Sequence, residues 1–173
     1  MNEVLEILKY TVPAIIVLIA AVLIIRQMVK NDQNRRNFEM IIKNQQLVTP
    51  VRLQAYERLT LLLERVSPES LVVRISKPTM TAKQLQSELL TTIRAEFDHN
   101  VSQQIYVTVQ TWEIIKNSRT KIIQLINTAA ARVKPDSPAI ELSKIILEDL
   151  MVQDKSPTSM ALEALKSEVK QLY

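Results

Sequence analysis

The single histidine of the chain stands at a spacing that can hold a metal ion. Glu96 and His99 form a Glu-x-x-His motif, which places a carboxylate and an imidazole on one side of a helix. Helical bundles that bind two metal ions carry such a motif on each of two helices, together with further glutamates. The chain has only one histidine, so it cannot supply the second motif. We therefore predict no metal site here and place His99 at a helix C-terminus, where a cation is favourable.

Composition excludes most other catalytic sites. The chain has no cysteine, which excludes disulfides, thiolate metal sites and a cysteine nucleophile. It has no glycine, which excludes the glycine-rich loops that bind nucleotide phosphates. No serine stands in a recognisable nucleophile turn. The sequence thus predicts no catalytic residue, no cofactor and no small-molecule substrate, and indicates a protein that is not an enzyme.

Two Glu-Arg pairs are the candidate partner-binding surface. Glu57-Arg58 and Glu64-Arg65 stand seven residues apart, about two turns, so both pairs fall on one face of a helix. Such a face can dock a partner helix, with charge setting the register. It is also typical of a solvated edge beside a buried leucine face, and this simpler interpretation is favoured. Partner binding by these residues remains a hypothesis.

A long apolar run near the N-terminus, Tyr10 to Ile25, is broken only by Thr11. About 20 residues are needed to cross a bilayer, and apolar residues on both sides of the run extend it to that length. A cleaved signal peptide and a buried core helix are the alternatives. The first nine residues lack a basic region, and no small-residue cleavage site follows the run. A retained transmembrane anchor is therefore the favoured interpretation.

Basic residues behind the run predict the orientation of this anchor. Such residues mark the cytoplasmic side of a membrane helix, so the N-terminus is expected outside and the rest of the chain in the cytoplasm. They also attract anionic lipid, by about 1 kcal/mol per charge near the surface. The predicted membrane-flanking residues are Tyr10, Arg26, Lys30, Arg35 and Arg36.

The rest of the chain is predicted to be helical. A chain without glycine is poorly suited to tight β-turns, and its apolar residues recur at intervals of three and four residues. The expected helices are 27–46, 51–66, 68–75, 81–98, 102–133 (opened by Ser102 or Asn100), 140–152 and 158–172. The first of these is expected to end before Pro50, and the long fifth one has a possible break near Asn117. Trp112 is expected in the core, or else as an interface anchor.

The predicted fold class is therefore all-α: an N-terminal transmembrane helix followed by a cytoplasmic helical bundle. The expected division is 1–29 for the anchor, 30–49 for a juxtamembrane helix or linker, and 50–173 for the helical domain. The helix 158–172 can pack on the bundle or dock on a partner, and the sequence favours neither.

The segment AYERLTLLLERVSPESLVVR, Ala55 to Arg74, carries a resemblance to a family. With the apolar run and the basic stretch before it, it resembles uncharacterised single-pass membrane-anchored helical proteins of Bacteroidota-type bacteria. The resemblance implies a bacterial inner-membrane location and no activity.

Two functions are consistent with these features. The first is a non-enzymatic accessory or scaffold subunit of a plasma-membrane protein complex, with the lipid bilayer and a protein partner or a second copy as its partners. The alternative is a membrane-tethered nucleic-acid or ribosome-binding module, suggested by a pI near 9.4. We rank the alternative lower, because the basic residues gather beside the apolar run, where topology already explains them.

Overall fold

The computed structural model describes residues 2–153 and 155–172, without the side chains of residues 2–14, 44 and 172. The chain divides into two compact units, Met1–Pro50 and Val51–Tyr173. The all-α fold class is confirmed for the described residues, whose elements are α1 (Asn2–Arg65), α2 (Pro68–Ile75), α3 (Ala82–Asn100), the 3-10 helix η1 (Val101–Tyr106), α4 (Val109–Ala130), α5 (Ala139–Val152) and α6 (Ser159–Leu172).

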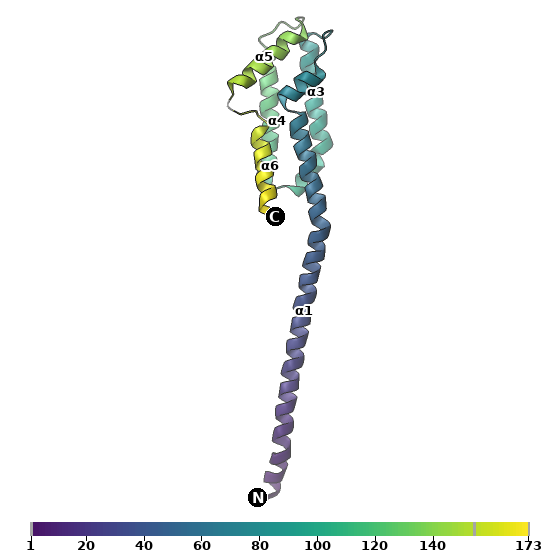
Figure 1. Cartoon of the computed structure of the whole chain (residues 1–173), viewed down its shortest axis with the longest axis vertical. Helices are drawn as coiled ribbons and strands as arrows, with labels where there is room; N and C mark the ends of the chain where they lie inside the picture. Colours follow the sequence, from purple (N-terminus) through teal and green to yellow (C-terminus); the bar gives the residue numbers. More distant parts are fainter. Residues whose placement is uncertain (1, 154, 173) are drawn as a thin grey trace. The chain divides into compact units, whose positions relative to one another are not determined.

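The second unit is a helical bundle. Figure 1 shows α6 beside α4, and α4 also packs against α3 and α5. The short helix α2 packs against α3 and α5. Apolar residues at intervals of three and four supply the core, as the sequence predicts. Its fully buried members include Leu59, Leu63, Leu89, Ile93, Ile115, Ile122 and Ile146.

Side-chain caps fix where several of these helices begin. Ser67 accepts a hydrogen bond from the Ser70 amide at the start of α2, where Pro68 occupies the first position. Thr81 and Gln84 form a complete capping box at the start of α3. These two caps confirm the predicted helix starts, because each satisfies backbone donors that a first turn leaves free.

Two predicted helix boundaries are wrong. The chain does not break before Pro50, since α1 runs from Asn2 to Arg65. The predicted long helix 102–133 is not continuous: η1 ends at Tyr106, and Thr108 caps a new helix by accepting from the Thr111 amide. The break therefore lies at 107–108 and not near Asn117.

Three apolar residues within the predicted helices are exposed, although their spacing predicts that they are buried. Leu53 is 41% exposed, Ile105 is 74% exposed and Val109 is 78% exposed. Ile105 and Val109 flank the break at 107–108, so the helical period that would have turned them inward does not hold there. Trp112 is half-buried and packs against the core, as expected.

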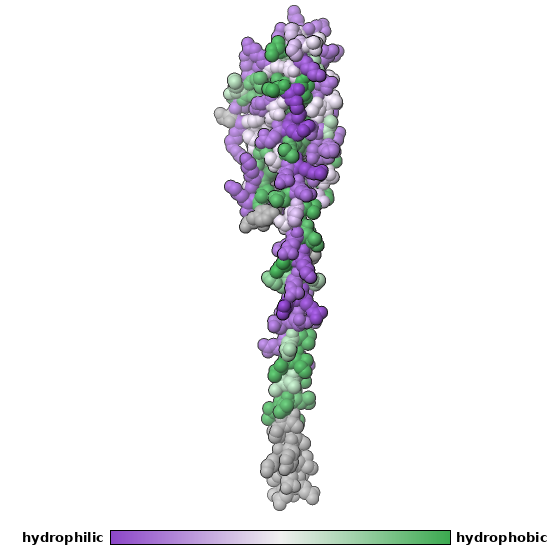
Figure 2. Space-filling model, turned by 45° about the vertical axis from the view of Figure 1, so that its right-hand side comes forward, coloured by the Kyte–Doolittle hydropathy of each residue, from purple (hydrophilic) through white to green (hydrophobic). Residues whose placement is uncertain are grey.

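The described part of α1 carries the apolar run. Within the residues that the structure describes, no helix is both long and apolar enough to cross a membrane. Every described side chain from Ile15 to Val48 is exposed. Figure 2 shows the apolar part of this stretch as a green band, followed by a purple, hydrophilic one.

Candidate functional site

The four residues of the predicted partner-binding face are all exposed. Glu57, Arg58, Glu64 and Arg65 lie on the last three turns of α1. Three of the four leucines between them are buried, namely Leu59, Leu62 and Leu63, whereas Leu61 is exposed. The face is thus a solvated edge beside a buried leucine face, which agrees with the simpler interpretation. Its role in partner binding stays a prediction.

Arg65 is engaged within the bundle. Its Nε and Nη2 atoms lie 2.7 Å and 2.6 Å from Oε1 of Glu96 on α3. Its backbone carbonyl accepts a hydrogen bond from Arg74 on α2. The Arg65 side chain is 56% exposed, so the ion pair adds at most about 1 kcal/mol to stability. Arg65 therefore links α1 to α3 and is only partly available to a partner.

The pairing of Glu96 with Arg65 also bears on the Glu-x-x-His motif. Glu96 is 16% exposed and its carboxylate faces Arg65, whereas the His99 side chain is exposed at the end of α3. Among the described residues, no group of three or more histidine, cysteine, aspartate and glutamate side chains gathers to hold a metal ion.

The two predicted partner surfaces meet in one shallow, open groove. Glu64 and Arg65 line it from α1, and residues at the start of α6 line its other side. Hydroxyl groups dominate the rest of the lining, which consists of Ser67, Glu69, Ser70, Ser156, Thr158, Ser159 and Leu162. The groove joins distant segments of the sequence, yet it is too open to enclose a small molecule.

A buried acid with a lowered pKa lies elsewhere in the bundle, on α6. Glu168 is 8% exposed, and its Oε1 atom accepts from the Tyr56 hydroxyl at 2.8 Å and from the Thr108 amide at 2.8 Å. Its Oε2 atom accepts from the Thr108 hydroxyl at 2.8 Å. Arg52 in turn donates to the Tyr56 hydroxyl at 3.3 Å and to the Tyr106 carbonyl at 3.3 Å. We call these four side chains, Arg52, Tyr56, Thr108 and Glu168, the Glu168 network.

The environment shifts the pKa of both acids in the Glu168 network. Burial raises the pKa of Glu168, but hydrogen bonds from Thr111, Tyr56 and Thr108 outweigh burial and leave this pKa below its ordinary value. The pKa of Tyr56 is raised by burial and by the neighbouring carboxylate, against a smaller opposite effect of Arg52. Glu168 is thus an ionised acceptor between Tyr56 of α1 and the N-terminus of α4, where a negative charge is favourable.

The Glu168 network answers the open question about the last helix. Ala161 and Leu165 of α6 are buried in the core, and Ser118 of α4 donates to the Pro157 carbonyl at 2.7 Å just before α6. The C-terminal helix therefore packs on the bundle. A sequence signal for Glu168 exists, since it continues the buried stripe of Ala161 and Leu165 at helical spacing.

Four of the five residues predicted to flank a membrane are exposed on α1. Arg35 pairs with Glu39 at 3.0 Å, and Arg36 pairs with Asp32 at 3.0 Å. Arg26 and Lys30 are exposed, and Tyr10 lies outside the residues whose side chains are described.

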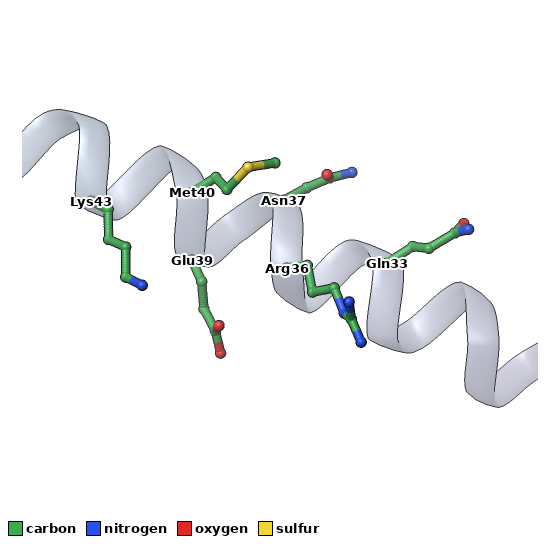
Figure 3. A pocket seen from close by; sticks show the side chains of 6 residues that line it. All are labelled: Gln33, Arg36, Asn37, Glu39, Met40 and Lys43. Carbon is green, nitrogen blue, oxygen red and sulfur yellow. The ribbon is translucent and has the colours of Figure 1, made fainter.

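The recess in Figure 3 has no opposing wall, because one helix supplies all of its lining: Gln33, Arg36, Asn37, Glu39, Met40 and Lys43.

One family model matches nearly the whole chain. Residues 2–172 match the family model described as a family of unknown function (DUF7935). The chain belongs to the DUF7935 family. No curated protein and no solved structure matches this DUF7935 protein. The family assignment agrees with the expected likeness to an uncharacterised family and adds no activity.

Proposed function

We propose that this DUF7935 protein is a non-enzymatic accessory or scaffold subunit of a plasma-membrane protein complex, anchored by one N-terminal transmembrane helix. The observation that carries the proposal is the exposed apolar run of α1. Ile15 to Ile25 are eleven successive apolar residues, and the large ones among them are 40–67% exposed. An apolar surface of this extent is unfavourable in water and marks a contact with lipid or protein.

The length of the apolar run favours contact with lipid over contact with a groove of another protein. At about 1.5 Å per residue, eleven residues cover roughly half of a bilayer of about 30 Å. The run continues in the sequence through Tyr10 to Ala14, whose side chains lie outside the described residues, and through Met28 and Val29. Lys9 and Arg26 bracket it, as residues that reach to the two interfaces of a bilayer do.

The proposed topology places the N-terminus outside and the bundle in the cytoplasm of a bacterial cell. It rests on the basic residues Arg26, Lys30, Arg35, Arg36 and Lys43, which outnumber Asp32 and Glu39 in the same stretch. The location in the inner membrane follows from the resemblance to proteins of Bacteroidota-type bacteria.

The bundle supports a role in binding rather than catalysis. Among the described residues, every buried side-chain nitrogen and oxygen atom has a hydrogen-bond partner. The Glu168 carboxylate, whose pKa is lowered, has both oxygen atoms occupied by groups of the bundle itself. Two surfaces are proposed to meet a protein partner. One is the groove between the start of α6 and the end of α1, and the other is the edge formed by Glu57, Arg58 and Glu64.

The nucleic-acid alternative gains no support from the bundle. Residues 51–173 contain sixteen basic and fourteen acidic residues, which is close to balance. Binders of nucleic acid concentrate positive charge on one face, because phosphate contacts supply most of their affinity. We therefore keep the scaffold role as the single proposal.

Fractionation of cells that express the full chain tests the anchor. The wild-type chain should stay in the membrane pellet in alkaline carbonate and dissolve only with detergent. Replacing Leu18 and Leu23 by arginine should release it, because each charge at the centre of a membrane helix costs about 3 kcal/mol. The matched control replaces Leu47 and Val51, exposed apolar residues outside the run, and should stay in the pellet. Release of the wild-type chain without detergent would refute the anchor.

Topology and partner binding need separate measurements. Lys144 is 74% exposed on the bundle, and the chain has no cysteine of its own, so a Lys144→Cys variant reports the side of the membrane. A membrane-impermeant maleimide should label it only after lysis, and labelling of intact inner-membrane spheroplasts would contradict the proposed orientation. Purification in mild detergent should recover another protein with the chain, and a strictly monomeric species would argue against a scaffold.

A further inference from the structure

The charged residues of α1 between 31 and 48 gather on one side of the helix. At about 100° per residue, they fall within an arc of about 100°. They also pair with one another along the helix, Asp32 with Arg36 and Arg35 with Glu39, each at 3.0 Å. The five charged residues are Asp32, Arg35, Arg36, Glu39 and Lys43.

The opposite side of the same stretch carries no charge. Starting from Asn34, residues alternately four and three apart form a neutral stripe: Asn34, Phe38, Ile41, Gln45 and Val48. Phe38 is 63% exposed, Ile41 is 55% exposed and Val48 is 53% exposed. This alternation is the spacing with which parallel helices pack side by side over several turns.

The chemistry of the neutral stripe fits its own copy. In a parallel, in-register pair each residue faces its equivalent, so a charged residue in the stripe would meet a like charge. Asn34 and Gln45 avoid this problem, because an amide is both donor and acceptor and pairs with an identical amide. A polar amide within such a seam also fixes register. The charged arc points away from the seam, where its ion pairs remain intact.

The exposure of α1 from Ile15 to Val48 favours a partner for this stretch. A single helix gains most of its stability in proteins from packing an apolar face. No described side chain from Ile15 to Val48 is buried, so nothing within the described chain provides that packing. A common anchor in one bilayer would hold two copies parallel and close together, which raises their effective concentration.

We propose that two copies of this protein associate in parallel through the neutral stripe of α1, Asn34 to Val48. The parallel orientation rests on the proposed membrane anchor, whereas the seam itself rests on the distribution of charged, amide and apolar residues. The chemistry of the stripe favours a second copy as the partner, because its uncharged residues and its amides can each face their own equivalents.

Disulfide formation in membranes tests this contact directly, because the chain has no cysteine. Ile41→Cys and Val48→Cys lie in the proposed seam, and Lys43→Cys and Gln46→Cys are the matched controls on the charged side. Facing positions of a parallel pair come within the roughly 4.4–6.8 Å that a disulfide allows between Cα atoms. Under mild oxidation, the two seam variants should form at least about ten times more covalent dimer than the controls.

A second change separates the seam from chance collisions. Phe38→Glu sets two like charges against each other in the seam and should lower dimer formation by Ile41→Cys at least about tenfold. Met40→Glu, on a different side of the helix, should leave it within about twofold. Equal cross-linking at all four positions, or a maximum on the charged side, would overturn the proposal.

The other outcomes of the cross-linking experiment identify what covers the neutral stripe if a second copy does not. If the Ile41→Cys variant forms no dimer and its thiol is shielded from a water-soluble maleimide, lipid covers the stripe. An adduct of the same variant with another protein would identify a different partner. Both results overturn self-association. Fractionation of the same samples separates the two proposals: membrane-bound chain without dimer refutes the seam alone, and soluble chain with seam-specific dimer refutes the anchor alone.

Discussion

Removing the carboxylate of Glu168 should detach the C-terminal helix from the bundle. Glu168→Ala leaves three donors without their acceptor: the Tyr56 hydroxyl, the Thr108 amide and the Thr108 hydroxyl. An unsatisfied buried donor costs about 1–3 kcal/mol, and the low end applies where water can reach the donor, as at the exposed residue Thr108. Taking the low end for each donor, the free energy of unfolding should fall by about 3 kcal/mol.

Glu168→Gln should have a smaller effect. The amide retains one oxygen acceptor in the place of Oε1, which serves both Tyr56 and the Thr108 amide. It loses the charge and the second acceptor, so a loss of about 1–2 kcal/mol is expected. The free energy of unfolding should therefore be lowest for Glu168→Ala, intermediate for Glu168→Gln and highest for wild type. This order is specific to a carboxylate that accepts several hydrogen bonds.

Tryptophan fluorescence during urea unfolding of the full chain in mild detergent measures this effect. Trp112 is the single tryptophan and lies on α4, one turn after Thr108, packed against the core. With a slope of about 1.5 kcal/mol per molar urea, the Ala variant should unfold at about 2 M less urea. Glu163→Ala on the same helix is the control: its ion pair with Lys155 is exposed, and it should shift stability by less than about 0.5 kcal/mol. An Ala variant at position 168 as stable as this control would refute the role of the Glu168 network.

Further outcomes follow from the same contacts. The folded pKa of Glu168 lies below its ordinary value of 4.5, so its stabilisation is present above that value and is lost as the pH falls through the folded pKa. The difference in stability between wild type and Glu168→Gln should therefore shrink in acid unfolding curves as the pH falls below 4.5. Ser118→Ala leaves the Pro157 carbonyl without its 2.7 Å donor and should lower the free energy of unfolding in urea by about 1–2 kcal/mol. Leu89→Ala opens a cavity at a fully buried position and should lower it by about 2–5 kcal/mol, whereas Leu61→Ala, at a position 61% exposed, should change it by less than about 1 kcal/mol.

Most of the bundle was predictable, because its local signals agree with its packing. The start of α2 is encoded by Ser67 and Pro68, and the start of α3 by Thr81 and Gln84. Each of these caps needs only residues within a few positions of one another. The starts and ends of α5 and α6 likewise follow from prolines and apolar spacing that lie close in the sequence.

The wrong boundaries show where local signals compete. The residue before a proline is disfavoured in the α conformation, and this predicts an end before Pro50. The helix continues because Gln46, whose carbonyl Pro50 leaves without a donor, is exposed, so water can satisfy that carbonyl. At Thr108 the opposite happens: the apolar spacing continues through the position, but the threonine cap and the hydrogen bonds from Thr108 to Glu168 break the helix.

The Glu168 network was missed because its members are far apart in the sequence. Glu168 lies 112 residues from Tyr56 and 60 residues from Thr108, so no local motif joins them. The Glu-Arg pairs of α1 drew attention instead, because seven-residue spacing is visible in one short segment, although exposed charges contribute little to stability. A glutamate on an otherwise apolar stripe is the better signal, since a buried carboxylate must find donors from other elements. For this chain the donors come from α1 and from the start of α4, and the carboxylate that joins them fixes α6 onto the bundle.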